Sequence, residues 1–473
     1  MIYEVREKII ESIRLRLRAD VPVGIYLSGG LDSSSIAGIA KYLVEEKGIN
    51  VGNQDLKQKL ACFSIQFDKD SGFDESGTYD NDHASFSLSL LIEMHVDIAE
   101  RTAKFLGVDM HLKKMNEAEL AKHFEDCVWH SEHFISDLNS VGKFALSELP
   151  RDLGFKVILS GEGADEMFGG YAWFLPDFLG EPDQSSPDLP LQQDDLLRQR
   201  LHEKSISDIK ATFRKKRVVL KQCEVDHEVK EQLNGMASPM IFTMGVTQED
   251  LYLPAWQNKY TASDLLRRTI DTWSPSAQEN IKHNWHVLHS AMYAWAKCQL
   301  PNYLLTTLGD RGEMAHSIEG RPPFLDHHLA ELMGDIPPSL KMYYCSDAET
   351  LDAGNGAPWD KNENKAGDKI FEKWILREAV KPFLSEELYL RRKHPFTAPV
   401  KWPKGGPLHQ LFTRLLTREN IGALGFIQWS TVQKSLEAAF GDESDSGAWR
   451  SCLVVGSMVV LSQRFGVPPV STK

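Results

Sequence analysis

The stretch IYLSGGLDSSSIAGIA, at positions 25–40, constrains the fold more than any other part of the chain. An apolar run leads directly into two glycines, an aspartate and three hydroxyl side chains, and a helical pattern follows at once. This order predicts a strand, a tight turn and the start of a helix. Such a turn directs backbone N–H groups and the positive end of the helix dipole at one spot, so the stretch predicts an anion-binding site.

The residue types in this turn suit the phosphates of a nucleotide. Gly29 and Gly30 let the backbone approach a ligand closely. The hydroxyls that could donate hydrogen bonds to the anion are those of Ser28, Ser33 and Ser34. Asp32 would repel bare phosphate, but it becomes a ligand if Mg²⁺ bridges carboxylate and phosphate oxygens. The chain has no G-x-x-x-x-G-K-S/T loop, so the anion must be held differently. The structural alternative is a plain glycine turn before a serine-capped helix.

A second motif, VILSGEGADEMFGGY at 157–171, again places Ser-Gly directly after an apolar run. Glu162, Asp165 and Glu166 then follow within five residues. Crowded carboxylates repel one another unless a cation or a proton relieves them. The motif alone is equally consistent with a solvated acidic loop, but together with the first motif it predicts an Mg²⁺ ion shared by Asp32 and Asp165.

The first part of the chain alternates short apolar runs with helical stretches, which is typical of βα units around a parallel sheet. The expected strands are 23–27, 62–67, 108–112 and 156–159. We therefore expect an α/β fold with an open parallel sheet and helices on both faces. Residues 1–180 should form the nucleotide-binding core, and the ligand should lie at the carboxyl ends of the strands, where strand order reverses.

Long helical patterns dominate residues 181–473, which should pack against the sheet and complete a single domain. We expect helices in the amino-terminal stretch 1–20 and in the late apolar run CLVVGSMVVL, which is too short to span a bilayer. The segment 179–195, rich in turn residues and acid, is predicted to be an exposed linker.

Composition excludes some classes of function. The net charge of −14, from 53 basic and 67 acidic residues, argues against a broad grip on a nucleic-acid backbone. The six cysteines lie far apart with no CxxC pair, which argues against a zinc site or a compact disulfide framework. No segment targets a membrane. These features favour a cytoplasmic protein that does not bind nucleic acid or a membrane.

Taken together, the motifs resemble the synthetase domain of asparagine synthetase and its relatives in the PP-loop ATP pyrophosphatase superfamily. Five blocks in the family's order carry the resemblance: 16–37, 62–68, 157–171, 304–326 and 373–399. The resemblance implies that ATP transfers AMP to a carboxylate with release of pyrophosphate, and that an amine then attacks the acyl-adenylate to form an amide. The usual carboxylate in that family is the side chain of aspartate.

The resemblance also implies roles for individual residues. Besides the turn at Ser28, Gly29, Gly30, Asp32, Ser33 and Ser34, the residues that would line the ATP site are Leu27, Ile65, Ser160 and Gly161. Asp32 and Asp165 would hold Mg²⁺. Glu162 matches a glutamate needed for adenylate formation and amine attack, and it is a sensible base for an ammonium that must lose a proton. Lys393 matches a lysine near the phosphates and the acyl oxyanion, and Lys373 one that meets pyrophosphate. Without the family context, both lysines would be read as solvated helix residues.

The block at 304–326 is interpreted as structural. We expect a set of charged side chains in it to form buried ion pairs under the site. These residues are Asp310, Arg311, Glu319 and Arg321.

Two departures from the family pattern affect the expected function. Glutamine-dependent asparagine synthetases begin with a domain whose amino-terminal cysteine attacks glutamine, whereas the first cysteine here is Cys62. We therefore expect no glutamine hydrolysis, with nitrogen coming from free ammonia, a separate glutaminase or a substrate amine. Residues 77–96 interrupt a smooth join from Ser76 to Asp97 and are either a surface insertion or a retained intron, which sequencing of the mature transcript distinguishes.

The leading hypothesis is an ATP- and Mg²⁺-dependent ligase that makes asparagine from aspartate and ammonia. The alternatives are a specialised amide or lactam synthetase on another substrate, and a nucleotide-binding homologue that has lost turnover. The sequence leaves the oligomeric state open, with a homodimer as one expected assembly.

Overall fold

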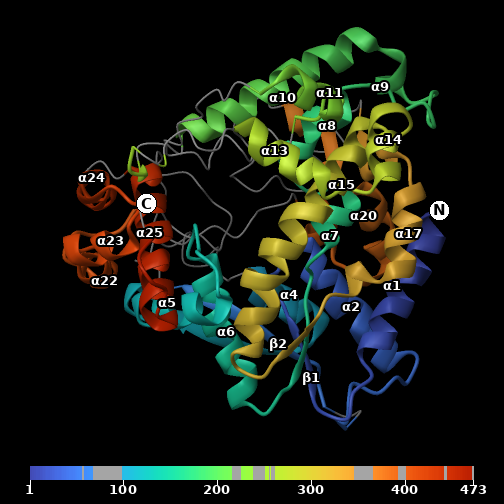
Figure 1. The fold of residues 1–473 in the computed structure, drawn as a ribbon. Helices are drawn as coiled ribbons and strands as arrows, with labels where there is room; N and C mark the ends of the chain where they lie inside the picture. The colour runs from blue at the N-terminus through green and yellow to red at the C-terminus, as the bar shows by residue number, and fades with distance from the viewer. Residues whose placement is uncertain are drawn as a thin grey trace, which may run out of the picture.

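A five-stranded parallel sheet organises the structure, a computed structural model (Figure 1). The residues that it describes are 1–55, 58–67, 98–215, 225–237, 251–254, 256, 262–345, 366–391, 401–441 and 445–470. The strands of the sheet are β1 (Val23–Tyr26), β2 (Ala61–Phe67), β3 (Asp109–Met115), β4 (Val157–Leu159) and β5 (Glu319–Arg321). The segment 77–96 lies outside the described residues.

The strand order is β3-β2-β1-β4-β5, and every neighbouring pair is parallel. The chain moves outward from β1 through β2 to β3 and then returns to the other side of β1 with β4. Strand order therefore reverses between β1 and β4. The strand that follows β1 in the chain, β2, lies on one side of this pair, and the strand that follows β4, β5, lies on the other. The four strands and the α/β class predicted from the sequence are confirmed.

The fifth strand, β5, was not predicted. Its sequence, Glu-Gly-Arg, has neither β-branched residues nor an alternating pattern. It forms because Glu319, Gly320 and Arg321 pair in register with Val157, Ile158 and Leu159 of β4.

Helices make up most of the remainder. Those of the first half of the chain are α1 (Ile2–Arg16), α2 (Leu31–Glu45), α4 (Ile98–Leu106), α5 (Glu117–Ser131), α6 (Asn139–Asp152), α7 (Ala164–Phe168), α8 (Leu175–Leu179), α9 (Pro190–Gln193), α10 (Asp195–Lys215) and α11 (His227–Leu233). Those of the second half are α13 (Ala262–Asp271), α14 (Pro275–His283), α15 (Val287–Gln299), α16 (Arg311–Met314), α17 (His327–Asp335), α18 (Pro338–Lys341), α20 (Trp374–Val380), α21 (Glu386–Leu390), α22 (Pro407–Leu415), α23 (Arg418–Leu424), α24 (Trp429–Ala439) and α25 (Ser446–Phe465). The helices predicted at the amino terminus and in the late apolar run are confirmed as α1 and α25.

The two faces of the sheet bury different side chains because successive residues of a strand point to opposite sides. Ile25 of β1 belongs to an apolar core with α1, α2, α17 and α20. Its neighbour Tyr26 packs on the other side with Phe63 of β2 and Leu146 of α6. On that side a larger core joins α5 and α6 to α22 and α25, the red helices in Figure 1. Helices thus cover both faces, as predicted.

A third apolar core lies among the helices from α8 to α15. It also includes residues of a small antiparallel sheet, which consists of β6 (Met342–Tyr344) and β7 (Ile370–Glu372). The predicted exposed linker at 179–195 is only partly correct. Asp183 and Leu191 within it are buried, and the Asp183 carboxylate accepts a hydrogen bond from the backbone N–H of Ser339 at 3.0 Å. In the described part of the chain, no helix has the length and apolar character needed to cross a membrane.

Candidate active site

The turn that follows β1 has the conformation that its glycines predict. Leu27 is buried at the end of the strand, and Gly29 has φ of +73°, a value that L side chains rarely adopt. Gly30 caps the N-terminus of α2. The backbone N–H of Ser28 donates to the Ser33 hydroxyl at 3.1 Å, and the two hydroxyls lie 3.0 Å apart. The local sequence therefore fixes a tight turn with hydroxyls gathered at the start of a helix.

The other residues predicted to line the ATP site lie on β2, α2 and the turn after β4. Ile65 is on β2, and Ser34 is fully buried in α2. The backbone N–H of Ser160 donates to a β5 carbonyl at 3.1 Å. Gly161 lies against α2, because a Cβ atom at this position would be 3.0 Å from the Cβ of Asp32. The turns after β1 and β4 are therefore in contact.

Lys373 joins the two aspartates that were predicted to bind metal. Its Nζ lies 2.7 Å from both carboxylate oxygens of Asp32 and 2.6 Å from Oδ1 of Asp165. The side chain of Lys373 is 1% exposed. The residue has φ of 54° and immediately precedes α20. A buried ammonium ion thus lies between carboxylates that come from opposite sides of the strand-order reversal.

This cluster requires a residue without a side chain at Gly170, which the sequence analysis missed. A Cβ atom at this position would lie 2.0 Å from Cε of Lys373 and 2.1 Å from Oδ1 of Asp165. Any side chain would therefore push the lysine and the aspartate apart. The Gly-Gly pair at the end of the second motif was the available signal.

The donor atoms of Asp32 and Asp165 fit Mg²⁺. Both carboxylates are oxygen donors, and they converge closely enough for one Lys373 ammonium to contact both. No group of three or more His, Cys, Asp or Glu side chains within the described ranges could hold a metal ion. Mg²⁺ commonly binds through one or two carboxylates and completes its shell with phosphate oxygens and water. Asp32 and Asp165 would therefore hold Mg²⁺ together with a nucleotide.

Glu166, next to Asp165, is an acid in an aromatic environment. Its side chain is buried and accepts a hydrogen bond from the Tyr171 hydroxyl at 2.6 Å. The Trp295 indole N–H lies 3.4 Å from the same oxygen. Burial and the charge of Asp165 together raise the pKa of Glu166 to about 7. Glu166 therefore packs beside Asp165 as an acid whose protonation changes near neutral pH.

Glu162 belongs to a second cluster that is also centred on a lysine. Oε1 of Glu162 lies 2.9 Å from Nζ of Lys143 on α6, and Oε1 of Glu313 on α16 lies 3.5 Å from the same nitrogen. Burial alone would lower the pKa of Lys143, but the charges of Glu162 and Glu313 outweigh it and raise that pKa. The sequence analysis missed Lys143 and Glu313. Glu313 stood in a block already singled out, but nothing in the local pattern of Lys143 marked it.

Two other predictions have different outcomes. Lys393 lies outside the described residues, so its catalytic role stays a prediction. The ion pairs expected to be buried in the 304–326 block are instead partly exposed or involve other partners. Asp310 is exposed, and Arg311 instead contacts Glu132 at 3.0 Å in a pair with side chains 39% and 59% exposed. Arg321 does pair with Glu319 at 2.6 Å, but the Glu319 side chain is 59% exposed.

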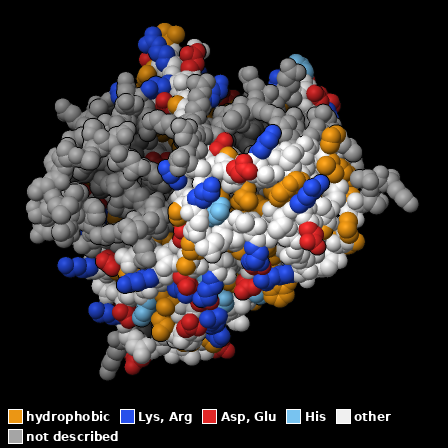
Figure 2. All heavy atoms as spheres, turned by 90° about the vertical axis from the view of Figure 1, so that its left-hand side faces the viewer, with side chains coloured by type: hydrophobic (Ala, Val, Ile, Leu, Met, Phe, Trp, Pro, Cys, Tyr) orange, Lys and Arg blue, Asp and Glu red, His pale blue; other side chains and the backbone are white. Residues whose placement is uncertain are grey.

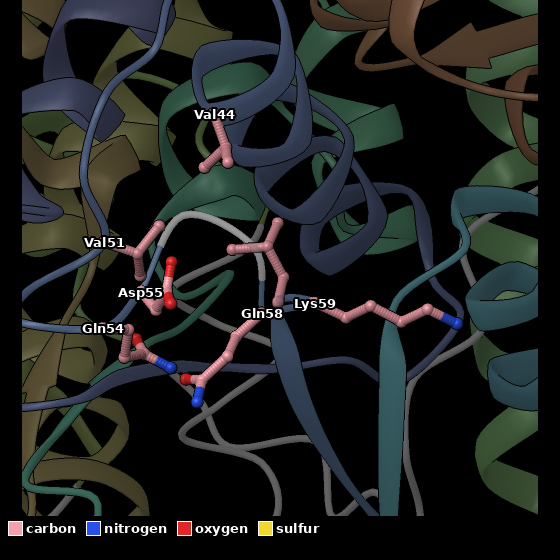
Figure 3. A pocket seen from close by; sticks show the side chains of 7 residues that line it. Val44, Val51, Gln54, Asp55, Gln58 and Lys59 are labelled. Atoms are coloured by element: carbon pink, nitrogen blue, oxygen red, sulfur yellow. The ribbon is translucent and has the colours of Figure 1, made fainter.

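A small pocket lies at the opposite end of the sheet from these clusters (Figure 3). It lies between the end of α2 and the start of β2, and its lining includes Val44, Asp55 and Leu60. On the face of the molecule shown in Figure 2, the coloured basic side chains (blue) and acidic side chains (red) are interspersed with one another.

Comparison with known protein families gives a match that covers most of the chain, including both turns at the strand-order reversal. The sequence pattern of the asparagine synthase family matches residues 4–459. The chain therefore belongs to the asparagine synthase family. The nucleotide that this family uses is ATP.

Three relatives illustrate where this asparagine synthase family member stands. It is 37% identical to amidase chyE of Penicillium rubens over 99% of this chain and 63% of the relative. It is 37% identical to amidase chry2 of Gibberella zeae, over 99% of this chain and 62% of the relative. The glutamine-hydrolyzing asparagine synthetase 1 of Bacillus subtilis is 24% identical over 94% of this chain and 57% of its own length. The chain thus spans about three fifths of the length of these relatives.

Proposed function

We propose that the protein is an ATP-dependent amide-forming ligase that activates a carboxylate as its adenylate and transfers the acyl group to an amine. The observation that carries this proposal is the convergence of Asp32 and Asp165 on one cation at the strand-order reversal. The turn after β1 supplies backbone N–H groups and hydroxyls beside it. This combination suits a nucleotide triphosphate whose leaving pyrophosphate gathers negative charge.

In the first step, a substrate carboxylate oxygen attacks the α-phosphorus of ATP, and the bond to the pyrophosphate oxygen breaks. Lys373 provides positive charge where the pyrophosphate leaves. The start of α2 and the hydroxyls of Ser28 and Ser33 orient the phosphates. Bound Mg²⁺, held by Asp32 and Asp165, would supply further charge neutralisation for the phosphate oxygens.

In the second step, the amine nitrogen attacks the acyl carbon, and the bond to AMP breaks. AMP leaves with the electron pair, and the nitrogen loses a proton. Glu162 is the carboxylate that we assign to take this proton, because it lies three residues before Asp165 and its side chain is 33% exposed. A base must reach the attacking nitrogen, which a fully buried side chain could not.

Aspartate with ammonia is the first substrate pair to test. A second candidate, an amide ligase that acts on another carboxylate and amine, is favoured by the identities. Two relatives named amidases are 37% identical to this chain, whereas an asparagine synthetase that matches nearly as much of it is 24% identical. The nitrogen sources compatible with this proposal are free ammonia, a separate glutaminase and an amine of the substrate itself.

The test measures pyrophosphate release from ATP and Mg²⁺ with single carboxylates from a panel of amino acids and dicarboxylic acids. Hydroxylamine is included to trap any acyl-adenylate as a hydroxamate. Carboxylate-dependent pyrophosphate release is expected, and asparagine is the product if aspartate and ammonium support it. Nucleotide binding with no release across the panel would instead support the non-catalytic alternative.

A further inference from the structure

Lys143 connects three separate elements at the edge of the candidate active site. It extends from α6 and contacts Glu162, in the turn after β4, at 2.9 Å. It also contacts Glu313, on α16, at 3.5 Å. The Lys143 ammonium lies 5.7 Å from the centre of the Tyr26 ring on β1, within the range of a cation–π interaction. The side chain that has been assigned the proton transfer is thus anchored by a residue outside the family motifs quoted above.

The environment gives this anchor an electrostatic role. Glu313 is 3% exposed, and burial raises its pKa while the charge of Lys143 opposes that rise. One lysine therefore contacts a buried carboxylate, Glu313, and a partly exposed one, Glu162. If the cation were removed, Glu162 and Glu313 would repel each other as like charges, and Glu162 would lose the 2.9 Å contact that fixes its position.

We propose that Lys143 is a positioning residue for amide formation, which holds the Glu162 carboxylate in the place where it accepts the proton of the attacking amine. The inference rests on the proposed function and deepens it. In the step concerned, the nitrogen lone pair forms the C–N bond, the C–O bond to AMP breaks, and the proton moves from nitrogen to a carboxylate oxygen of Glu162. Lys143 contacts no reacting atom.

The inference predicts an uncoupling that a general loss of structure would not produce. Adenylation draws its charge stabilisation from the Asp32 and Asp165 cluster with Lys373, so the loss of Lys143 should impair amide formation more than pyrophosphate release. Without Lys143 the acyl-adenylate should still form but should be lost to water more often than to the amine. The decisive quantity is the amount of amide formed for each pyrophosphate released, since this ratio is independent of the fraction of folded enzyme.

The experiment compares the full chain with Lys143→Met and Lys143→Arg, using whichever carboxylate and amine support pyrophosphate release by the wild type. The matched control is Lys113→Met. Like Lys143, Lys113 forms an ion pair with a glutamate: its Nζ, on β3, lies 2.7 Å from Glu148 of α6. The Lys113 side chain is 22% exposed, compared with 17% for Lys143. Pyrophosphate and amide are measured in the same reactions.

We expect the amide-to-pyrophosphate ratio to fall at least fivefold in Lys143→Met, to recover partly in Lys143→Arg, and to stay at the wild-type value in Lys113→Met. A wild-type ratio in Lys143→Met would overturn the inference, even if both products fell together, because that pattern indicates a purely structural role. If the wild type released no pyrophosphate with any carboxylate of the panel, the proposed function would fail, and this inference with it.

Discussion

The ammonium group of Lys373 lies 2.7 Å from each carboxylate oxygen of Asp32, although the two residues are 341 positions apart in the chain. This pair links the start of α2 to the residue before α20, and Asp165 completes it at 2.6 Å from the same nitrogen. The charged side chains of this cluster therefore lie where strand order reverses, which is where α/β sheets bind ligands.

Asp32→Asn tests the catalytic importance of this cluster. The substitution keeps the side-chain shape but removes the negative charge that would hold Mg²⁺ with the nucleotide. We expect carboxylate-dependent pyrophosphate release to fall about 100-fold or more, as for the loss of a single charge-stabilising group in other active sites. Circular dichroism of the same samples checks that the variant is folded. A variant with wild-type turnover would show that Asp32 is not part of the site.

Lys373→Met should leave Asp32 and Asp165, whose side chains are 15% and 11% exposed, without the ammonium group between them. Breaking a buried ion pair in this way costs about 3–5 kcal/mol of unfolding free energy, which urea denaturation measures. Mg²⁺ should restore part of that loss by binding the carboxylates, by roughly 2.7 kcal/mol at about 100 times its dissociation constant.

Lys341→Met is the matched control for this measurement. Lys341 is also buried, but it donates to the backbone carbonyl of Met333. Its substitution leaves Lys373 between Asp32 and Asp165, where the ammonium competes with Mg²⁺, so the stability of this variant should respond to Mg²⁺ less than that of Lys373→Met. An equal Mg²⁺ response in both variants would contradict the assignment of Asp32 and Asp165 as metal ligands.

Gly170→Ala tests the close approach in the same cluster. The new Cβ would lie 2.0 Å from Cε of Lys373 and 2.1 Å from Oδ1 of Asp165, far inside van der Waals contact, so the pair must separate. Overpacking of this kind costs about 1–3 kcal/mol, and we expect pyrophosphate release to fall about tenfold or more with it. Gly422→Ala on α23 is the control, because no heavy atom lies within 4 Å of a Cβ there and alanine favours helix. Equal losses in the two variants would refute the role of Gly170.

Glu166 should make stability depend on pH. Its pKa is raised from 4.5 to about 7 by burial and by Asp165, so the folded protein holds a proton that the unfolded chain releases. This contribution to stability is complete below pH 4.5 and is lost as pH rises to about 7. In that window Glu166→Gln should remove a slope of up to about 1.4 kcal/mol per pH unit. Parallel wild-type and variant curves from urea unfolding at pH 5–8 would contradict the assignment.

The strands and the first two motifs could be predicted because their signals are local. Apolar runs that end in glycine and serine identify β1 and β4 wherever the rest of the chain lies. β5 could not be predicted, since Glu-Gly-Arg becomes a strand only beside the finished edge of β4. Local pattern thus identified β1 to β4 and missed β5, which forms only by pairing with β4.

The charged residues show the same limit. Asp32 and Asp165 stood in recognisable motifs, and their convergence followed from the expected sheet. Lys143 lies in the middle of a helix with no motif around it, and only the packing of α6 against the sheet brings it to Glu162. Conversely, Arg311 and Glu319 looked structural and buried from their block, but both are at the surface because neighbouring elements do not cover them.

The measurement that tests the central claim most directly is the identity of the nucleotide products. The full chain is incubated with ATP, Mg²⁺, hydroxylamine and carboxylates labelled with ¹⁸O, beginning with aspartate, and the products are analysed by mass spectrometry. Adenylation predicts AMP and pyrophosphate in equal amounts, AMP that carries one ¹⁸O atom from the carboxylate, and loss of both products in Asp32→Asn. Formation of ADP and phosphate, or of AMP without the label, would contradict the account.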